Sequence, residues 1–286
     1  MQFQILSMKR AKAPLLLIAI AALFSACTER IDLELNDDGN RRIVVEGWFT
    51  DQEEQHEVKL TWTTSYFANQ PAPPVEGALL SISDGETTIV LQEEAPGIYR
   101  TPVTAGTPGK TYTLTIEHEG ELYTASSFMR DSAPIDSLHV RVLDPQEEFG
   151  VPFDPYYSVR IWTQENPGQG DCYMWRTYVN GEGVRDTLRE LSFIDDNLYD
   201  GVYVADTEVD FLEIDEEAST GDTVRIEQFN IGQDAYDIFI GIMNETDWNG
   251  GLFDAPPANV ETNISNGGLG YFGAASVREA ETVIEE

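Results

Sequence analysis

The residues with the clearest potential for chemistry are acidic ones in the segment DDNLYDG, at positions 195–201. Carboxylate and amide oxygens are the ligands that Ca²⁺ prefers, and an EF-hand loop places them at positions one, three and five, with glycine at six. Asp195 and Asn197 fit the first two of these positions, but Tyr199 occupies the third and Asp200 occupies the glycine position. The segment therefore predicts either a solvated turn or a noncanonical calcium site. The candidate ligands of such a site are Asp195, Asp196, Asn197 and Asp200.

Motifs that indicate catalysis are absent from the sequence. His56, His118 and His139 fall in separate predicted strands or turns, and none has a neighbour at a metal-ligand spacing. The chain contains no GxSxG nucleophile turn, no HExxH zinc motif and no phosphate-binding glycine loop. We therefore predict a protein that is not an enzyme.

Aromatic residues give a second candidate for a contact site. Tyr66 and Phe67 precede the proline-rich loop ANQPAPPVEG. Exposed rings at such a place could stack on a sugar or insert into a partner protein, whereas aromatic residues in strands more often belong to the core. The two interpretations stay open for Tyr66 and Phe67, while Trp62, on the predicted strand before them, is expected in the core.

The N-terminus has the pattern of an export signal. Basic residues between positions 9 and 12 precede an apolar run at 15–24, which is shorter than the roughly 20 residues that a membrane-spanning helix needs. Small residues then lead to a cysteine in the sequence LFSAC, which resembles the lipobox of bacterial lipoproteins. Residues 1–26 are therefore predicted to be a signal peptide, and Cys27 is predicted to carry the lipid, palmitate included. An ordinary secretory signal is the alternative.

Net charge and cysteine content narrow the function further. The formal net charge of −34 makes binding to nucleic acid very unfavourable, and it opposes docking on anionic lipid headgroups, so membrane attachment has to be covalent. Residues 27–40 are interpreted as an acidic tether. Only Cys27 and Cys172 are present, so lipidation of the first leaves no partner for an internal disulfide. We expect Cys172 to be a buried, inert thiol.

Short strands dominate the rest of the chain. Alternating or β-branched segments separated by turns occupy residues 41–130, which predicts an N-terminal β-sandwich domain. A polar, proline-containing stretch at 129–138 looks like a domain junction, and strands resume in a C-terminal β-rich domain at 135–286. The only helical spacing lies at 233–246. The predicted fold is all-β, with tandem immunoglobulin-like sandwich regions and one short helix near the C-terminus.

Several motifs, taken in order, carry a resemblance to a known family. They are IVVEGWFTD, PPVEGALLSISDG, PGIYRTPVTAGTPGKTYTLTIEHEGELYTA, PIDSL, NLYDGVY, GDTVRIEQFNIGQDAYDIF and FDAPPANVETNISNGGLGYFGAASV. Together they resemble the domain-of-unknown-function 4249 family (DUF4249) of Bacteroidota. The resemblance implies an outer-membrane lipoprotein, of a kind often encoded beside TonB-dependent receptors, and it supplies no catalytic residues. Acid soon after Cys27, at Glu29, Asp32 and Glu34, resembles a signal for display on the cell surface.

These observations lead to one functional expectation and one alternative. We expect a lipid-anchored protein on the outer face of the outer membrane. It would act without catalysis as an accessory or ligand-binding partner of a TonB-dependent transporter. The alternative is a structural module for adhesion or envelope assembly, without a small ligand.

Overall fold

The computed structural model describes residues 41–64, 70–185, 187–246 and 260–285. The predicted signal peptide, Cys27, the acidic tether, Tyr66 and Phe67 all lie outside the described residues. Residues 41–286 form one compact unit. No helix among the described residues has the length and apolar character required to cross a membrane.

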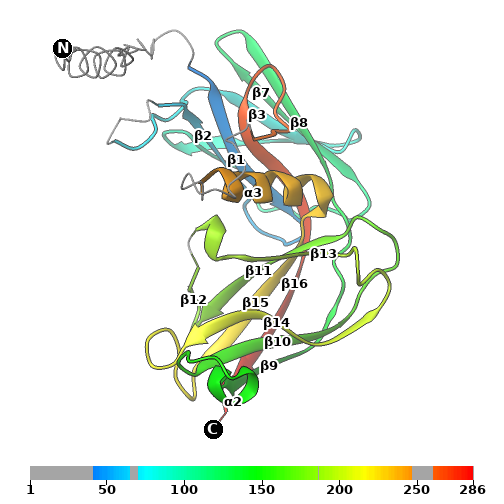
Figure 1. The fold of residues 1–286 in the computed structure, drawn as a ribbon. Helices are drawn as coiled ribbons and strands as arrows, with labels where there is room; N and C mark the ends of the chain where they lie inside the picture. The colour runs from blue at the N-terminus through cyan, green and yellow to red at the C-terminus, as the bar shows by residue number, and fades with distance from the viewer. Residues whose placement is uncertain (1–40, 65–69, 186, 247–259, 286) are drawn as a thin grey trace, which may run out of the picture. The chain divides into compact units, whose positions relative to one another are not determined.

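The N-terminal half of this unit is a sandwich of two sheets over one core (Figure 1). Alternation along the strands decides which side chains enter that core: in β7, Tyr112, Leu114 and Ile116 are buried while their neighbours are more exposed. One sheet contains β1 (Ile43–Thr50), β2 (Glu57–Trp62), β5 (Gln92–Ala95) and β6 (Ile98–Arg100). The facing sheet contains β3 (Leu79–Ser83), β4 (Thr88–Val90), β7 (Thr111–His118) and β8 (Glu121–Phe128).

The C-terminal half repeats this architecture with a second core. Val159 and Ile161 of one sheet pack with Ile226 of the other, and all three are at most 1% exposed. The smaller sheet contains β9 (Ile135–Leu143), β10 (Tyr156–Gln164) and β14 (Tyr203–Glu213). The larger contains β11 (Cys172–Val179), β12 (Glu182–Gly183), β13 (Ser192–Asp195) and β15 (Thr223–Asn230). The predicted all-β fold with tandem sandwich regions is therefore confirmed, and it is immunoglobulin-like in that mainly antiparallel sheets face each other.

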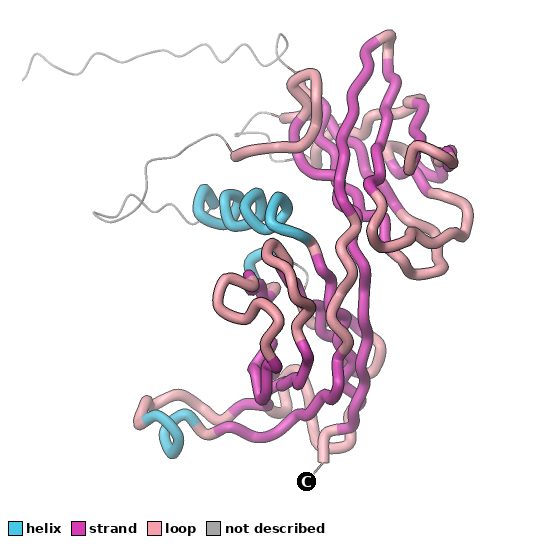
Figure 2. The backbone as a smooth tube through the Cα atoms, turned by 90° about the vertical axis from the view of Figure 1, so that its right-hand side faces the viewer, coloured by secondary structure: helices cyan, strands magenta, loops and turns pink. Residues whose placement is uncertain are grey.

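A single long strand, β16 (Leu269–Val283), belongs to both sandwiches (Figures 1 and 2). Its first part pairs in parallel with β1, from Val44 opposite Leu269 to Thr50 opposite Ala275. Its second part pairs antiparallel with β15, beginning with Ser276 opposite Asn230. The two larger sheets are consequently one nine-stranded sheet, ordered β12-β11-β15-β16-β1-β2-β6-β5 with β13 beside β11.

The predicted junction at 129–138 is the crossover between the sandwiches, and buried contacts fix it in place. Met129 and Ala133 are at most 1% exposed. The Ser132 amide donates to the Ser276 hydroxyl at 3.1 Å, and the Gln228 amide donates to the Ala133 carbonyl at 2.8 Å. The domain boundaries predicted at 130 and 135 fall inside this segment and stay a prediction, but the crossover itself is a packed element.

Helix α3 (Gly232–Thr246) covers part of the outer face of the nine-stranded sheet, as Figures 1 and 2 both show. Its spacing places Ala235, Ile238 and Phe239 on the sheet side, where they join a third apolar cluster. The predicted helix at 233–246 is therefore confirmed. A single 3₁₀ turn, η1 (Leu188–Glu190), packs at the edge of the same cluster.

The loop after β9 is an exposed excursion, as its prolines indicate, but it contains a short helix that the sequence analysis missed. Helix α2 (Pro145–Phe149) begins at Asp144, whose carboxylate accepts from the amides of Gln146 and Glu147. It ends at Gly150, which adopts the left-handed conformation.

Candidate functional site

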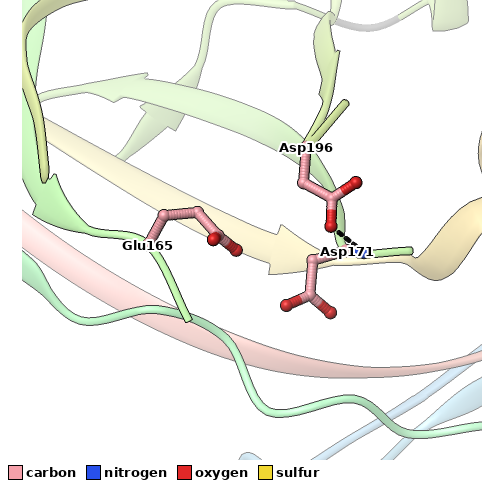
Figure 3. Close-up of side chains that lie close together, drawn as sticks. All are labelled: Glu165, Asp171 and Asp196. Carbon is pink, nitrogen blue, oxygen red and sulfur yellow. Dashed lines mark hydrogen bonds between the residues drawn. The ribbon is translucent and has the colours of Figure 1, made fainter. Parts of the chain in front are cut away.

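The predicted cation loop contributes one residue, Asp196, to a cluster of buried acids (Figure 3). Glu165, Asp171 and Asp196 each offer a carboxylate oxygen, and these oxygens lie within 4.8 Å of one another. All three residues are at most 5% exposed. Each lies next to a strand end: Glu165 follows β10, Asp171 precedes β11 and Asp196 follows β13. Pairing of β11 with β13 brings the last two together.

The other three candidate ligands lie outside this group of carboxylates and make other hydrogen bonds. Asp195 accepts from the backbone amide of Asn197 at 3.3 Å and from its side-chain amide at 2.8 Å. Asp200 accepts from the Gly168 amide at 2.7 Å. The cation site proposed from the sequence stays a prediction, and its best-placed member is Asp196.

Hydrogen-bond donors of the protein already bind several of the carboxylate oxygens in the acid cluster. Asp196 Oδ2 accepts from the backbone amides of Gly170 and Asp171, at 2.8 and 3.0 Å. Glu165 Oε2 accepts from the Gly201 amide at 2.5 Å, and its Oε1 accepts from the Tyr173 hydroxyl at 3.1 Å. These bonds tie the β10–β11 loop and strand β11 to the β13–β14 loop, which is a structural role in itself.

Among the three acids of the cluster, Asp171 is the one with a cationic side chain of the described residues close to its carboxylate. Its Oδ1 accepts from Arg130 at 3.2 Å and from the Asn230 side chain at 3.0 Å. Glu165 has no such cation among the described residues, and burial, together with the nearby charges of Asp171 and Asp196, raises its pKa. A low-dielectric site disfavours the charged carboxylate, so Glu165 is the group here that most readily takes a proton.

The hydrogen bonds of the three carboxylates leave few oxygens for a calcium ion. Ca²⁺ takes six to eight oxygen ligands, whereas donors already occupy one or both oxygens of each carboxylate here. The adjoining cavity, lined by Thr163, Glu165 and Gln228 among others, has a volume of about 30 Å³. The free surface of this cavity is almost entirely apolar, so it does not offer the roughly two to four polar partners that a buried water needs.

The remaining chemically suggestive residues have structural environments. Cys172 is fully buried, and burial together with nearby carboxylates raises the pKa of its thiol to about 12, so it is the inert thiol expected. His56 is buried, accepts from the Thr50 amide through Nδ1 and contacts the Thr104 carbonyl through Nε2, and burial lowers its pKa. His118 and His139 pack against tryptophan rings on separate strands.

A second candidate site is a large open groove on the outer face of the nine-stranded sheet, beside α3. Its volume is about 820 Å³, which falls within the range of about 300–1,000 Å³ that is typical of ligand pockets. The inward side chains of β1, β11, β15 and β16 fill the two sandwich cores, so alternation leaves their other side chains for this face. The segment 53–57, which leads into β2, forms one rim.

Aromatic side chains form the floor of the groove next to the helix. The Trp48 ring lies 5.6 Å from Tyr271, 5.9 Å from Phe239 and 6.3 Å from Phe229, measured between centroids. Trp48 is directly opposite Gly273, and a Cβ at that glycine would lie 2.3 Å from the indole. The absence of a side chain at Gly273 therefore allows the indole to lie on the sheet.

Charged residues also line the groove. Six glutamates line it, namely Glu46, Glu53, Glu54, Glu57, Glu227 and Glu279. Two cations also line it, Lys59 and Arg176. Lys59 pairs with Glu46 at 3.0 Å, whereas the Arg176 guanidinium stacks over the Phe229 ring at 4.9 Å.

The sequence analysis missed this groove. Arg176 and Glu227 are opposite each other on the paired strands β11 and β15, and β16 joins these strands to β1, which carries Trp48. The available signal was the outward set of β11 and β15, where Arg176, Tyr178, Arg225 and Glu227 alternate with buried residues. That pattern indicates a sheet face that is partly exposed to solvent, but it does not show which other strands form the same face.

Comparison with known proteins gives a match to one family model and likenesses to solved structures. A search of curated proteins gave no match to this sequence. The crystal structure of bovine butyrophilin is similar at 12% identity, covering 65% of this chain and 90% of that chain, with a TM-score of 0.22. Residues 28–281 match the family described as "Domain of unknown function (DUF4249)". This match spans nearly the whole described unit, and the chain belongs to the DUF4249 family.

Proposed function

We propose that this protein is a non-enzymatic, lipid-anchored binding protein of the outer membrane, displayed on the outer face as the accessory of a TonB-dependent transporter. The observation that carries the binding role is the open groove of about 820 Å³, whose walls combine an aromatic floor with charged side chains. A module with a purely structural role does not need such a concave, chemically mixed surface.

Two features of the sequence support the membrane part of the proposal. The segment LFSAC resembles a lipobox, which makes Cys27 the lipid-carrying residue. The net charge of −34 disfavours attachment to anionic headgroups, so a covalent anchor is the mode of attachment that remains physically reasonable. The motif order that first suggested the family is also that of lipoproteins encoded beside TonB-dependent receptors.

Affinity purification of the tagged, full-length protein from native outer membrane solubilised in mild detergent tests the proposal. We expect a barrel receptor to co-purify, and we expect mass spectrometry to find acyl chains on Cys27. The matched control is Cys27→Ser, which removes the acceptor sulfur and should release the protein from the membrane fraction. Purification without any barrel protein would favour the structural alternative, and an unmodified Cys27 would remove the anchor.

A further inference from the structure

We propose that the groove binds a short peptide. Its free C-terminal carboxylate pairs with Arg176, an apolar side chain packs on the aromatic floor, and a cationic group faces the acidic rim. This inference rests on the proposed binding role and deepens it, because it names the chemical class of the ligand. Three separate features of the groove correspond to the three parts of such a peptide.

The first feature is the state of Arg176. Among the described residues it has no carboxylate oxygen within ion-pair distance, although the chain has 51 acidic and only 17 basic residues. Glu227 is its direct cross-strand neighbour, but the oxygens of Glu227 accept from Tyr178 at 2.9 Å and from Arg225 at 2.5 Å. The Arg176 guanidinium therefore keeps its planar set of donors for an incoming carboxylate.

The residues around Arg176 favour the binding of a carboxylate to its guanidinium. Its guanidinium lies on the Phe229 ring, which fixes the plane of the donors and removes water from one side. Arg176 itself is half-buried, so an ion pair formed there is screened less by solvent than one on the open surface. A carboxylate that reaches this position gains a bidentate, oriented contact.

The second feature is the aromatic floor. Trp48 is only half-buried and lies against Phe229, the ring that carries Arg176. An apolar side chain adjacent to a carboxylate would thus meet aromatic surface when the carboxylate meets Arg176. This adjacency of a charge and an apolar group is the arrangement at the C-terminal residue of a peptide.

The third feature is the acidic rim, which favours a positive charge on the rest of the ligand. Glu53 and Glu54 are exposed groove residues with no ion pair among the described residues, whereas the nearby Glu57 pairs with Arg100 at 2.7 Å. With a net charge of −34 over the whole chain, a ligand with only negative charge is repelled before it reaches Arg176. A peptide with a free amino group or a lysine carries the compensating charge toward this rim.

Titration calorimetry on the mature lipoprotein in detergent tests the inference with two tripeptides, Lys-Leu-Phe and Lys-Ala-Trp, each as the free acid and as the C-terminal amide. We expect the acids to bind about tenfold tighter than the amides, because the amide cannot form a charge-assisted pair with Arg176. Arg176→Gln should abolish the difference between acid and amide, and Arg176→Lys should restore part of it.

Arg141→Gln is the matched control, because Arg141 is an exposed arginine on β9 outside the groove. It should leave both affinities and the acid-to-amide ratio unchanged. Equal affinity of acids and amides for the unaltered protein would overturn the inference, as would the absence of peptide binding. Binding of a neutral trisaccharide that is insensitive to Arg176→Gln would also overturn it.

These results separate the inference from the proposed function. If a barrel receptor co-purifies but the tripeptides do not bind, the inference fails while the transporter partnership stands. If the free acids bind through Arg176 but no receptor is recovered, the peptide site stands and the partnership fails.

Discussion

At the scale of single residues, one group of buried acids has a clear consequence for stability. Glu165, Asp171 and Asp196 are buried together, and Arg130 is the close cation that offsets part of their charge. Backbone amides and the Tyr173 hydroxyl stabilise the carboxylates by hydrogen bonding. Burial and mutual repulsion destabilise the charged carboxylates, and these interactions offset part of that effect. Protonation of the cluster should therefore change the free energy of unfolding.

Glu165 gives this cluster a defined pH dependence. Its pKa is raised in the native state by burial and by the neighbouring acids. The native state therefore binds the proton more tightly than the unfolded chain, and the resulting stabilisation is fully present below the unfolded pKa and is lost as pH rises through the native pKa. Each unit of difference between the two pKa values corresponds to about 1.4 kcal/mol.

Urea unfolding of the unaltered protein and of Glu165→Gln between pH 4 and 7 measures this effect. We expect the variant to gain stability relative to the unaltered protein as pH rises, because glutamine cannot ionise. Glu117→Gln, at an exposed position of β7, is the control and should show no such trend. A stability difference for Glu165→Gln that stays constant with pH would contradict the prediction.

At the scale of elements, the parallel pairing of β1 with β16 depends on a close approach at Gly270. This glycine has a φ of +86°, and a Cβ placed on it would lie 2.0 Å from the Val45 carbonyl oxygen. A side chain would therefore impose both a left-handed strain and a collision with the neighbouring strand. The same strand pair carries Trp48 and Tyr271 into the groove, so its geometry also sets the aromatic floor.

Replacement of Gly270 by alanine should consequently be far more damaging than its backbone conformation alone implies. We expect Gly270→Ala to lower the free energy of unfolding by more than about 2 kcal/mol, since the clash adds to a left-handed strain of about 1–2 kcal/mol. Gly267→Ala provides the matched comparison. Gly267 has a φ of +74° but no atom within 4 Å of its would-be Cβ, so only the strain remains. Equal losses in chemical denaturation would show that the close approach is unimportant.

At the scale of the whole described unit, two hydrophobic cores are joined by shared structure. β16 pairs with β1 beside one core and with β15 beside the other. Arg278, near the middle of β16, binds Asp51 at 2.9 Å and Asp131 at 2.5 Å, which ties the strand to the end of β1 and to the crossover. Unfolding of one sandwich would therefore remove pairing partners from the other.

This arrangement predicts one cooperative unfolding transition for residues 41–286. Leu114→Ala in the first core and Ile226→Ala in the second should each cost about 2–5 kcal/mol, because both side chains are fully buried. Each substitution should lower the stability of both halves together, as measured by calorimetry and by hydrogen exchange in β7 and β10. Two separate transitions, only one of which moves with each substitution, would show that the sandwiches fold independently.

Local patterns in the sequence determined the classes of the elements. The alternating segments within 41–130 predicted short strands such as β7, and the helical spacing of 233–246 predicted helix α3, because backbone geometry alone fixes which side chains share a face. Apolar and aromatic neighbours likewise predicted the burial of Cys172. The short helix α2 was also predictable, since Asp144, Pro145 and Gly150 are its start and stop signals.

Only the tertiary structure decided which elements meet. The sequence indicated two sandwich regions in succession, yet the last strand returns across about 225 positions to pair with the first, as Val44 opposite Leu269 illustrates. Pairings of that separation depend on the whole packed fold, because no local pattern encodes the partner of a strand. For the same reason, the acids 165, 171 and 196 became one cluster, and Arg176 and Trp48 came to line one groove.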